Sequence, residues 1–308
     1  MTFSHDIADY PEGIILPIDK PWRWTSADVI RKVKYAAIKH FRKKNLKVGH
    51  AGTLDPLATG VLLVCIGPAC KRAQEFQDHD KEYEAVVRFG ATTPSYDLEK
   101  EVDRTFPYGH VTEEAVRAVL PSFIGTQEQV APLFSAKSVD GVRAYEMARK
   151  MYRNAQKGIV DPDFDAAALE TLHHSTITIH ELELLDFSTR PPSSVEMTQP
   201  PFATAPSDVS SDPPSVISSG AAGGVEKSSL GTASSRIHFT DTSALGLPEA
   251  RIRIACSKGT YIRALARDLG EALGSGAFLS SLRRTKNGGY TLADAWTLDE
   301  VLGALTDR

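Results

Sequence analysis

Short runs in which apolar and polar residues alternate, or in which apolar residues follow one another, predict a protein with several strands. Residues 81–90 alternate so that Tyr83 and every second residue after it would share one buried face. Residues 61–66 are apolar throughout, as in a strand buried on both faces. The predicted strands comprise residues 13–18, 61–66, 81–90, 175–187 (one long strand or a strand pair) and 250–256.

Apolar residues spaced three or four positions apart predict helices. Residues 26–41 show this spacing, and Thr25 or Ser26 can accept a hydrogen bond from a free N–H of the first turn. A glycine-punctuated loop is expected at residues 49–60. The predicted helices comprise residues 26–41, 112–120, 144–152 and 261–273, the last ended by Gly274.

Residues 190–235 differ from the rest of the chain. The stretch is rich in Ser, Pro, Gly, Ala and Thr and has no hydrophobic periodicity, so it cannot bury enough apolar surface to offset the entropy of ordering it. Because strands are predicted on both sides, we interpret it as a disordered insertion within a single domain that spans residues 1–308. A linker between two domains is the alternative.

Charge is unevenly distributed along the chain. The net charge of −4 by itself argues against an RNA partner. Residues 19–50, however, hold ten Lys and Arg against two Asp, and residues 251–286 hold eight Lys and Arg against one Asp and one Glu. If the fold brings them together, these two basic segments form a surface for an anionic partner; otherwise they are two solvated faces.

Composition narrows the class of protein. The longest apolar run is too short to cross a bilayer, and the N-terminus lacks a secretory signal, so we expect a cytoplasmic protein. The cysteines, Cys65, Cys70 and Cys256, include no CxxC pair, which argues against a disulfide framework and a zinc site. We expect no metal or cofactor, and Cys65 as a buried, unreactive thiol.

The stretch KVGHAGTLDPLATG, residues 47–60, carries the strongest chemical signal. Its glycines allow the backbone to approach a ligand closely, and Asp55 stands directly before a proline. From these residues alone, Asp55 is at least as well explained as a helix N-cap with Pro56 at the first helical position.

Five segments, in order along the chain, resemble the TruB-type tRNA pseudouridine synthases. The stretch GHAGTLDPLATGVLLVCIG resembles the family's signature loop, which contains its catalytic aspartate. Residues 13–25 resemble its N-terminal strand and Lys-Pro turn, and residues 81–90 its Lys-x-Tyr strand. QVAPLFSAKSVDGVRAYEMAR (129–149) and RIACSKGTYIRALARDLGEALGSGAFLSSLRR (253–284) resemble its central and C-terminal motifs.

This resemblance implies roles for individual side chains. Asp55 would be the catalytic carboxylate, Arg263 its ion-pair partner, and Tyr83 the ring that stacks on the target base. From pattern alone, Tyr83 also fits a core aromatic residue and Arg263 a surface arginine. The residues implied to contact the substrate are His50, Tyr83, Tyr261 and Leu282, although a loop histidine is more often simply a hydrogen-bonding residue.

The resemblance also implies a fold and a reaction. We expect an α+β pseudouridine synthase fold, with a mixed, mostly antiparallel central sheet flanked by helices and loops. We expect isomerisation of a T-loop uridine (position 55 of tRNA) by base flipping, glycosidic cleavage and reattachment through C5. The expected partner is the T-arm of tRNA, with no membrane, no obligate protein partner and a monomeric chain. Attack on ribose C1′, attack on the base and sugar deprotonation stay open as routes.

Three departures from the family pattern stand out. The central motif has Ala131-Pro132 in place of a proline pair, and its lysine is displaced, so Lys137 is left out of the predicted site. Residues 152–170 look rearranged. Too few residues follow Arg284 for the C-terminal RNA-binding PUA domain of larger relatives, so we expect none.

Two rival functions remain. The first is an isomerase of the same family that acts on another RNA; the second is a tRNA-folding chaperone without turnover. The presence of Asp55, Tyr83 and Arg263 together argues against the chaperone, because folding assistance has no chemical need for all three.

Overall fold

The alternating and apolar runs pair into one mixed sheet. In the computed structural model, which describes residues 3–132, 138–139, 142–143, 174–189 and 237–306, this sheet has ten strands. Only β1 with β14 and β3 with β12 are parallel neighbours, so the expected α+β fold with a mostly antiparallel sheet is confirmed. The spatial order is β14 (Trp296–Thr297), β1 (Ile14–Lys20), β3 (Ala58–Ile66), β12 (Ala277–Asn287), β4 (Lys81–Phe89), β11 (Glu249–Cys256), β10 (His174–Ser188) and β7 (Gly125–Val130), with β2 (Val48–Ala51) beside β3 and β13 (Tyr290–Thr291) beside β12.

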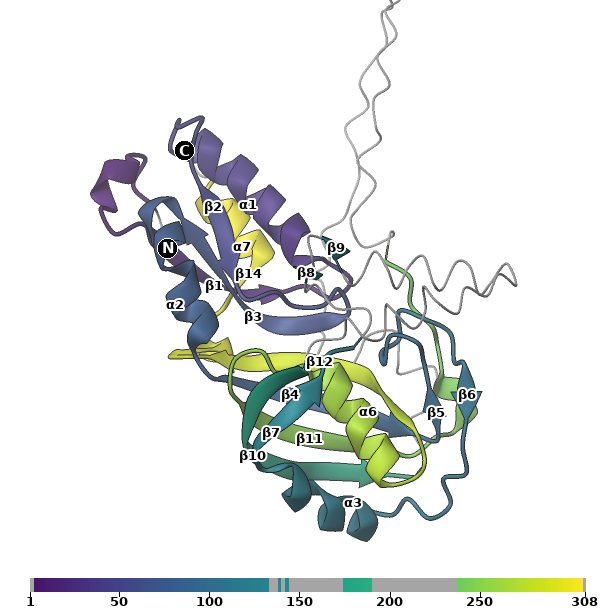
Figure 1. Cartoon of the computed structure of the whole chain (residues 1–308). Helices are drawn as coiled ribbons and strands as arrows, with labels where there is room; N and C mark the ends of the chain where they lie inside the picture. Colours follow the sequence, from purple (N-terminus) through teal and green to yellow (C-terminus); the bar gives the residue numbers. More distant parts are fainter. Residues whose placement is uncertain (1–2, 133–137, 140–141, 144–173, 190–236, 307–308) are drawn as a thin grey trace, which may run out of the picture.

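The helices lie at different places along this sheet (Figure 1). Helices α1 and α7 contact each other at one end of the molecule, whereas α6 contacts β12. The α-helices are α1 (Ser26–His40), α2 (Ala73–Asp78), α3 (Glu113–Val119), α6 (Ile262–Ala272) and α7 (Leu298–Ala304). Short 3₁₀ helices span Ile7–Asp9, Gly67–Arg72, Leu120–Phe123, Ser243–Leu245 and Leu292–Asp294, and two separate strand pairs join β5 (Ala91–Thr92) with β6 (Arg104–Thr105) and β8 (Ser138–Val139) with β9 (Val142–Arg143).

Helix α1 begins where its sequence predicts. The Thr25 hydroxyl accepts a hydrogen bond from the Asp28 N–H at 3.0 Å, and the Asp28 carboxylate accepts from the Thr25 N–H, which closes a capping box. Of the two candidate caps, Thr25 therefore fills the role. Ser26 is free to bond elsewhere, and it does so at the candidate site.

The predicted strands are confirmed, but several others were missed, among them β2, β7 and β12 of the main sheet. The alternation of β4 holds, with Tyr83 and every second residue after it buried, and residues 174–188 form one long strand, not a pair. No strand was predicted at β12, because Ser and Arg interrupt its apolar residues. Its arginine Arg284 is nevertheless buried, since carbonyl groups of distant residues accept its hydrogen bonds.

The predicted loop at residues 49–60 is wrong at both ends. Gly49 and His50 belong to β2 and pair with Cys65 and Val64 of β3, so the loop spans only residues 52–57. Gly60 lies within β3 with φ of +98°, and a Cβ there would stand 2.2 Å from the Arg284 carbonyl oxygen. Glycine thus allows β3 and β12 to come together at the centre of the sheet.

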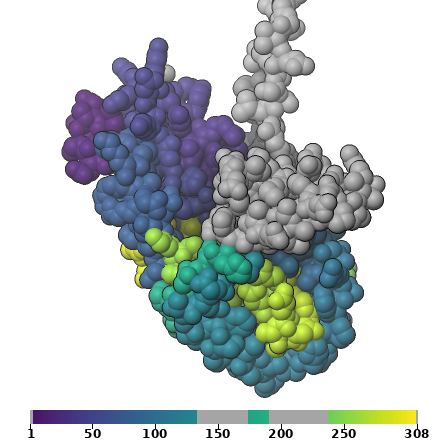
Figure 2. Space-filling model, in the orientation of Figure 1, coloured from purple at the N-terminus to yellow at the C-terminus, as the bar shows by residue number. Residues whose placement is uncertain are grey.

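The purple and blue N-terminal residues form one end of the molecule in the space-filling view (Figure 2).

Cys65 is buried as expected, and burial raises the pKa of its thiol to about 11. The predicted helix at 144–152, the insertion at 190–235 and Lys137 all lie outside the described residues.

Candidate active site

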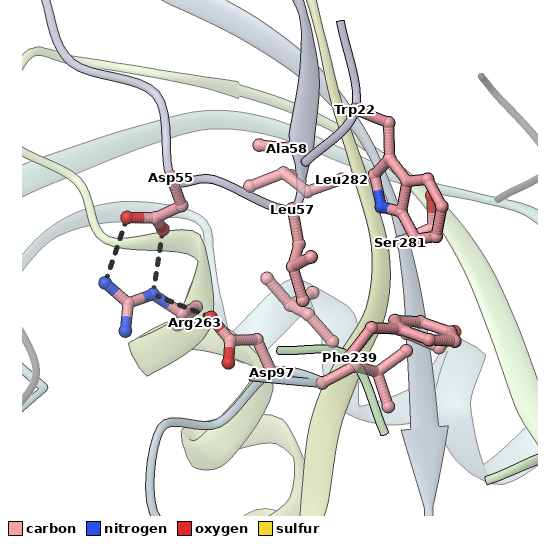
Figure 3. A pocket seen from close by; sticks show the side chains of 12 residues that line it. Trp22, Asp55, Leu57, Ala58, Asp97, Phe239, Arg263, Ser281 and Leu282 are labelled. Carbon is pink, nitrogen blue, oxygen red and sulfur yellow. Dashed lines mark hydrogen bonds and ion pairs between the residues drawn. The ribbon is translucent and has the colours of Figure 1, made fainter. Parts of the chain in front are cut away.

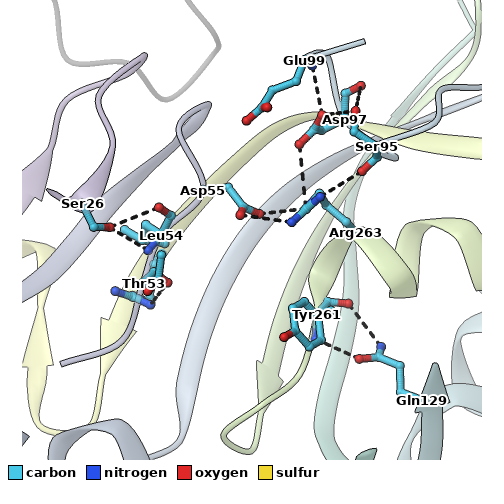
Figure 4. Close-up of polar contacts among 11 residues, drawn as sticks. Ser26, Thr53, Leu54, Asp55, Ser95, Asp97, Glu99, Gln129, Tyr261 and Arg263 are labelled. Carbon is cyan, nitrogen blue, oxygen red and sulfur yellow. Dashed lines mark hydrogen bonds and ion pairs between the residues drawn. The ribbon is translucent and has the colours of Figure 1, made fainter. Parts of the chain in front are cut away.

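The loop that carries Asp55 is held from three sides. The Ser26 hydroxyl donates to the Leu54 carbonyl at 3.1 Å and accepts from the Leu54 N–H at 3.0 Å (Figure 4). The Arg284 guanidinium donates to the Gly52 carbonyl at 3.1 Å, and the Lys20 ammonium donates to the Pro56 carbonyl at 3.2 Å. Residues just before and just after Asp55 are therefore fixed to α1, β12 and β1.

Asp55 forms a two-pronged ion pair with Arg263. The Arg263 Nε lies 2.8 Å from Asp55 Oδ2, and Nη2 lies 3.1 Å from Oδ1 (Figure 4). The Arg263 side chain is only 7% exposed and the Asp55 side chain 36% exposed, so the carboxylate keeps one side open. Neither alternative from the pattern holds: no helix begins after Asp55, and Arg263 is not a surface residue.

Two further carboxylates face the same guanidinium. Asp97 Oδ2 lies 3.8 Å from Arg263 Nε, and the Ser95 carbonyl accepts from Arg263 Nη1 at 3.1 Å. Burial by itself would lower the pKa of Arg263, but Asp55, Asp97 and Glu99 outweigh it and raise that pKa. The guanidinium therefore stays charged where a fork of fixed geometry suits a carboxylate.

The shared cation does not keep all three carboxylates strongly acidic. Burial raises the pKa of Asp97, with Arg263 opposing the shift. Burial and then repulsion from Asp97 and Asp55 raise the pKa of Glu99 to about 7. Because Asp55 is far more exposed than Asp97 and makes both close contacts to Arg263, it is the carboxylate placed to meet a substrate.

A large cavity opens beside the ion pair. Its volume is about 1150 Å³ up to the point where it meets solvent, and Tyr83, Tyr261 and Leu282 contribute ring and aliphatic surface to its wall. Tyr83 is also part of the hydrophobic core, so its interpretation as a core aromatic residue is confirmed, while its stacking on the target base stays a prediction. This main cavity is lined by Gly52, Thr53, Leu54, Asp55, Gln77, Lys81, Tyr83, Ser257, Gly259, Thr260, Tyr261, Ile262, Arg263, Leu282 and Arg284.

A smaller side hollow of about 330 Å³ lies on another side of the same ion pair (Figure 3). Asp55, Arg263 and Leu282 line both spaces. The side hollow has Trp22 and Phe239 at its rim, with ring centroids 5.2 Å apart in an edge-to-face arrangement. The ion pair thus stands between a roomy cavity of mixed polar and apolar lining and a narrower, more apolar hollow.

The first turn of α6 is fixed by a strand on the far edge of the sheet. Gln129 of β7 is buried, accepts a hydrogen bond from the Tyr261 N–H at 2.8 Å and donates to the Tyr261 carbonyl at 3.2 Å (Figure 4). Tyr261 has no side-chain cap of its own. The Gln129 amide therefore sets the position of Tyr261 and of the helix that carries Arg263.

Five of the six predicted site residues line the main cavity, and His50 does not. His50 lies on β2, where burial and the nearby Arg284 lower its pKa, so the imidazole is neutral near pH 7. No site role was predicted for the supporting residues Ser26, Arg284 and Gln129, because each acts on a segment remote in sequence. Gln129 and Arg284 stand at the ends of family-like motifs, and Ser26 was considered only as a helix cap.

The described residues offer no group of three or more His, Cys, Asp or Glu that could hold a metal ion. Nor do they include a helix long and apolar enough to cross a membrane. What the arrangement offers chemically is one carboxylate, fixed in orientation by a buried arginine, at the wall of a cavity with aromatic and aliphatic surface. Such a carboxylate can act as a nucleophile or as a base.

Comparison with known proteins agrees with this geometry. Residues 39–161 match the model of the TruB family pseudouridylate synthase N-terminal domain, and residues 263–307 match the tRNA pseudouridylate synthase B C-terminal domain. The chain is 40% identical over 291 residues to tRNA pseudouridine synthase B of Phocaeicola vulgatus, covering 94% of this chain and 92% of that protein. It is 41% identical over 286 residues to the protein of the same name from Bacteroides thetaiotaomicron, covering 93% and 90%.

A solved structure supports the fold. One chain of a Cbf5-Nop10-Gar1 complex superposes with a TM-score of 0.53 at 21% identity, covering 96% of this chain and 56% of that one. A likeness at this identity bears on the fold alone, whereas the two family models and the curated relatives bear on the enzyme class. The chain belongs to the TruB family of tRNA pseudouridylate synthases.

Proposed function

We propose that the protein converts a uridine of the tRNA T-loop to pseudouridine, with Asp55 as the catalytic carboxylate. The observation that carries the proposal is the Asp55–Arg263 pair at the wall of a cavity lined by Tyr83, Tyr261 and Leu282. Relatives at about 40% identity that bear the name tRNA pseudouridine synthase B support tRNA as the substrate.

The cavity suits a base that has left its stack. A uridine cannot be isomerised inside a stacked loop, so it must be flipped out, and aromatic and apolar walls then replace the lost stacking. Tyr83 and Leu282 supply such walls beside Asp55. The volume of the main cavity leaves room for the detached uracil to turn before it rejoins the ribose.

The reaction needs a carboxylate and no net exchange of atoms. The glycosidic bond at N1 breaks, the uracil turns, and C5 bonds to ribose C1′. The proton lost from C5 is balanced by one gained at N1. Attack on C1′, attack on the base and removal of a sugar proton all begin from the carboxylate of Asp55, which Arg263 holds in a fixed orientation.

Carbodiimide mapping of modified tRNA tests the assignment. Unmodified tRNA with the T-loop uridine, the same tRNA with cytidine at that position, and a ribosomal RNA fragment serve as substrates. We expect pseudouridine only at the T-loop uridine, none with Asp55→Asn, and wild-type behaviour of the exposed control Asp186→Asn. Modification of the ribosomal fragment alone favours the rival isomerase, and tRNA refolding without any modification favours the chaperone.

The single-domain organisation, monomeric state and cytoplasmic location remain predictions.

A further inference from the structure

A third concave region lies at the opposite end of β2 from the main cavity. It is lined by Lys34, residues 44–49 and Cys70, has a volume of about 780 Å³ up to solvent, and is called the lysine hollow here. Val48 and Gly49 of β2 belong to it, whereas the main cavity begins at Gly52, directly after the strand ends. Four strand residues span about 13 Å. Residues 44–47 of its lining belong to the loop that joins α1 to β2, two elements labelled in Figure 1.

The lysine hollow is strongly cationic. Residues 29–54 contain eight Lys and Arg and no Asp or Glu, in a chain whose net charge is −4. Lys34, Lys44 and Lys47 are exposed, and within the described part of the chain no carboxylate lies within 4 Å of any of the three. Their charges are therefore not neutralised inside the fold, and they add up over one concave surface.

The base of this hollow is fixed, although its charged ends are solvated. Leu46 is buried in the hydrophobic core, and the Lys47 carbonyl accepts a hydrogen bond from the Gly67 N–H at 2.8 Å. The side chains of Lys44 and Lys47 therefore extend from a stretch of backbone that is anchored at Leu46 and at Lys47. An anchored pair of lysines binds an anion with less ordering of the protein than lysines on a free tail would need.

We propose that the lysine hollow binds the phosphate backbone of the tRNA beyond the flipped nucleotide. This inference rests on the proposed function, because its occupant is the RNA whose uridine enters the main cavity. A polyanion that spans about 13 Å from one hollow to the other passes along β2, where it meets the neutral His50. The binding is electrostatic and independent of base sequence, since lysine offers only a compact positive charge to phosphate.

Salt dependence of tRNA binding tests the proposal. The double variant Lys44→Gln/Lys47→Gln is compared with Lys44→Arg/Lys47→Arg, which keeps both charges, and with Arg104→Gln/Arg117→Gln, which removes two exposed charges from β6 and α3. For each, the logarithm of the binding constant for full-length tRNA is measured against the logarithm of salt concentration by filter binding, and KM and kcat are measured at one salt concentration.

We expect the Lys44→Gln/Lys47→Gln slope to be shallower by about 2 than that of the wild type, with KM raised roughly tenfold and kcat unchanged. The arginine pair and the Arg104→Gln/Arg117→Gln control should keep the wild-type slope. A glutamine variant that matches the control in slope and KM overturns the proposal. If the wild type binds tRNA but makes no pseudouridine, the proposed function fails, while the slope still reports on the hollow.

Discussion

The two basic segments of this chain look alike in composition and do different work. Among the Lys and Arg of residues 19–50, only Arg31 forms an ion pair within the described part of the chain, with Asp28. Lys20 is buried and Arg23 donates to the Ile237 carbonyl, whereas the other seven, all from residues 32–47, are exposed. In residues 251–286, six of the eight cations have acidic partners. Those pairs are Arg251–Glu84, Arg253–Glu181 and Glu183, Lys258–Asp78, Arg263–Asp55, Arg267–Asp268 and Arg283–Asp19.

The difference teaches that a count of charges does not give the electrostatic role of a segment. The acidic partners of the second segment come mostly from strands and loops remote in sequence, so its cations are neutralised within the fold and at the site. The exposed cations of the first segment remain available to an anionic partner molecule. Changes in the second segment should therefore affect turnover or stability, and changes in the first should affect the salt dependence of RNA binding.

The largest effect should follow Arg263→Lys. Lysine keeps the positive charge but cannot make the two contacts to Asp55, so the carboxylate loses its fixed orientation. We expect kcat to fall by about 100-fold or more, with little change in the salt dependence of tRNA binding. Arg251→Lys, at an exposed pair with Glu84, is the matched control and should retain activity within about threefold. Equal losses in the two variants contradict the comparison.

The charge balance around Arg263 can be tested through Glu99, by measuring how the free energy of unfolding depends on pH. The pKa of Glu99 is about 7 in the folded protein and near 4.5 in the unfolded chain, so between these values the folded state holds a proton that the unfolded state has lost. Stability should therefore fall as pH rises from 4.5 to 7. Glu99→Gln removes this term, so its advantage over the wild type should grow across that window to about 2 kcal/mol and then level off. If urea unfolding gave parallel curves of unfolding free energy against pH for the wild type and for Glu99→Gln, this prediction would be wrong.

A smaller effect is expected where β7 holds the second segment in place. Gln129→Met removes both hydrogen bonds to the Tyr261 backbone at nearly unchanged volume. At about 0.7 kcal/mol each, their loss should lower kcat/KM roughly tenfold, without altering the salt slope of RNA binding. Gln127→Met, two residues earlier on β7 and bonded only to the Phe123 carbonyl, should cost less than about threefold. If both variants behave alike, Gln129 has no particular role at the site.

The smallest effect should follow removal of two paired surface charges from the second segment. Arg251 and Arg253 are held by carboxylates of β4 and β10, so Arg251→Gln/Arg253→Gln should change the salt slope of tRNA binding by less than about 0.5. Stability should change by less than about 1 kcal/mol, as for other exposed pairs. A slope change as large as that of Lys44→Gln/Lys47→Gln would erase the distinction between the two segments.

The elements that local pattern defines were predictable from the sequence. Strand β4, strand β11 and helix α1 with its Thr25 cap follow hydrophobic period and capping chemistry, which neighbouring residues determine. Strand β12 was missed because its buried Arg284 is tolerated only through carbonyl acceptors at Gly52, Thr53 and Val61, which the fold alone brings near.

The same limit applies to the site. The family resemblance pointed to Asp55 and Arg263, which lie 208 residues apart in sequence, and the structure places them in contact. It also pointed to His50 at the substrate; β2 places that side chain outside the main cavity, so contact between His50 and the RNA stays a prediction. Asp97 and Gln129 complete the surroundings of Arg263 and Tyr261, and nothing in their local sequence distinguishes them from other polar residues.

The central claim is that the carboxylate of Asp55, oriented by Arg263, carries out the chemistry. Its most direct measurement is the single-turnover rate of tritium release from C5-tritiated tRNA, for the wild type and for Asp55→Asn, at concentrations where each is saturated with tRNA. The account predicts unchanged tRNA binding and a rate at least about 10,000-fold lower in the variant, because an amide of the same shape can neither attack nor accept a proton as a carboxylate does. A variant rate within tenfold of the wild type would contradict it.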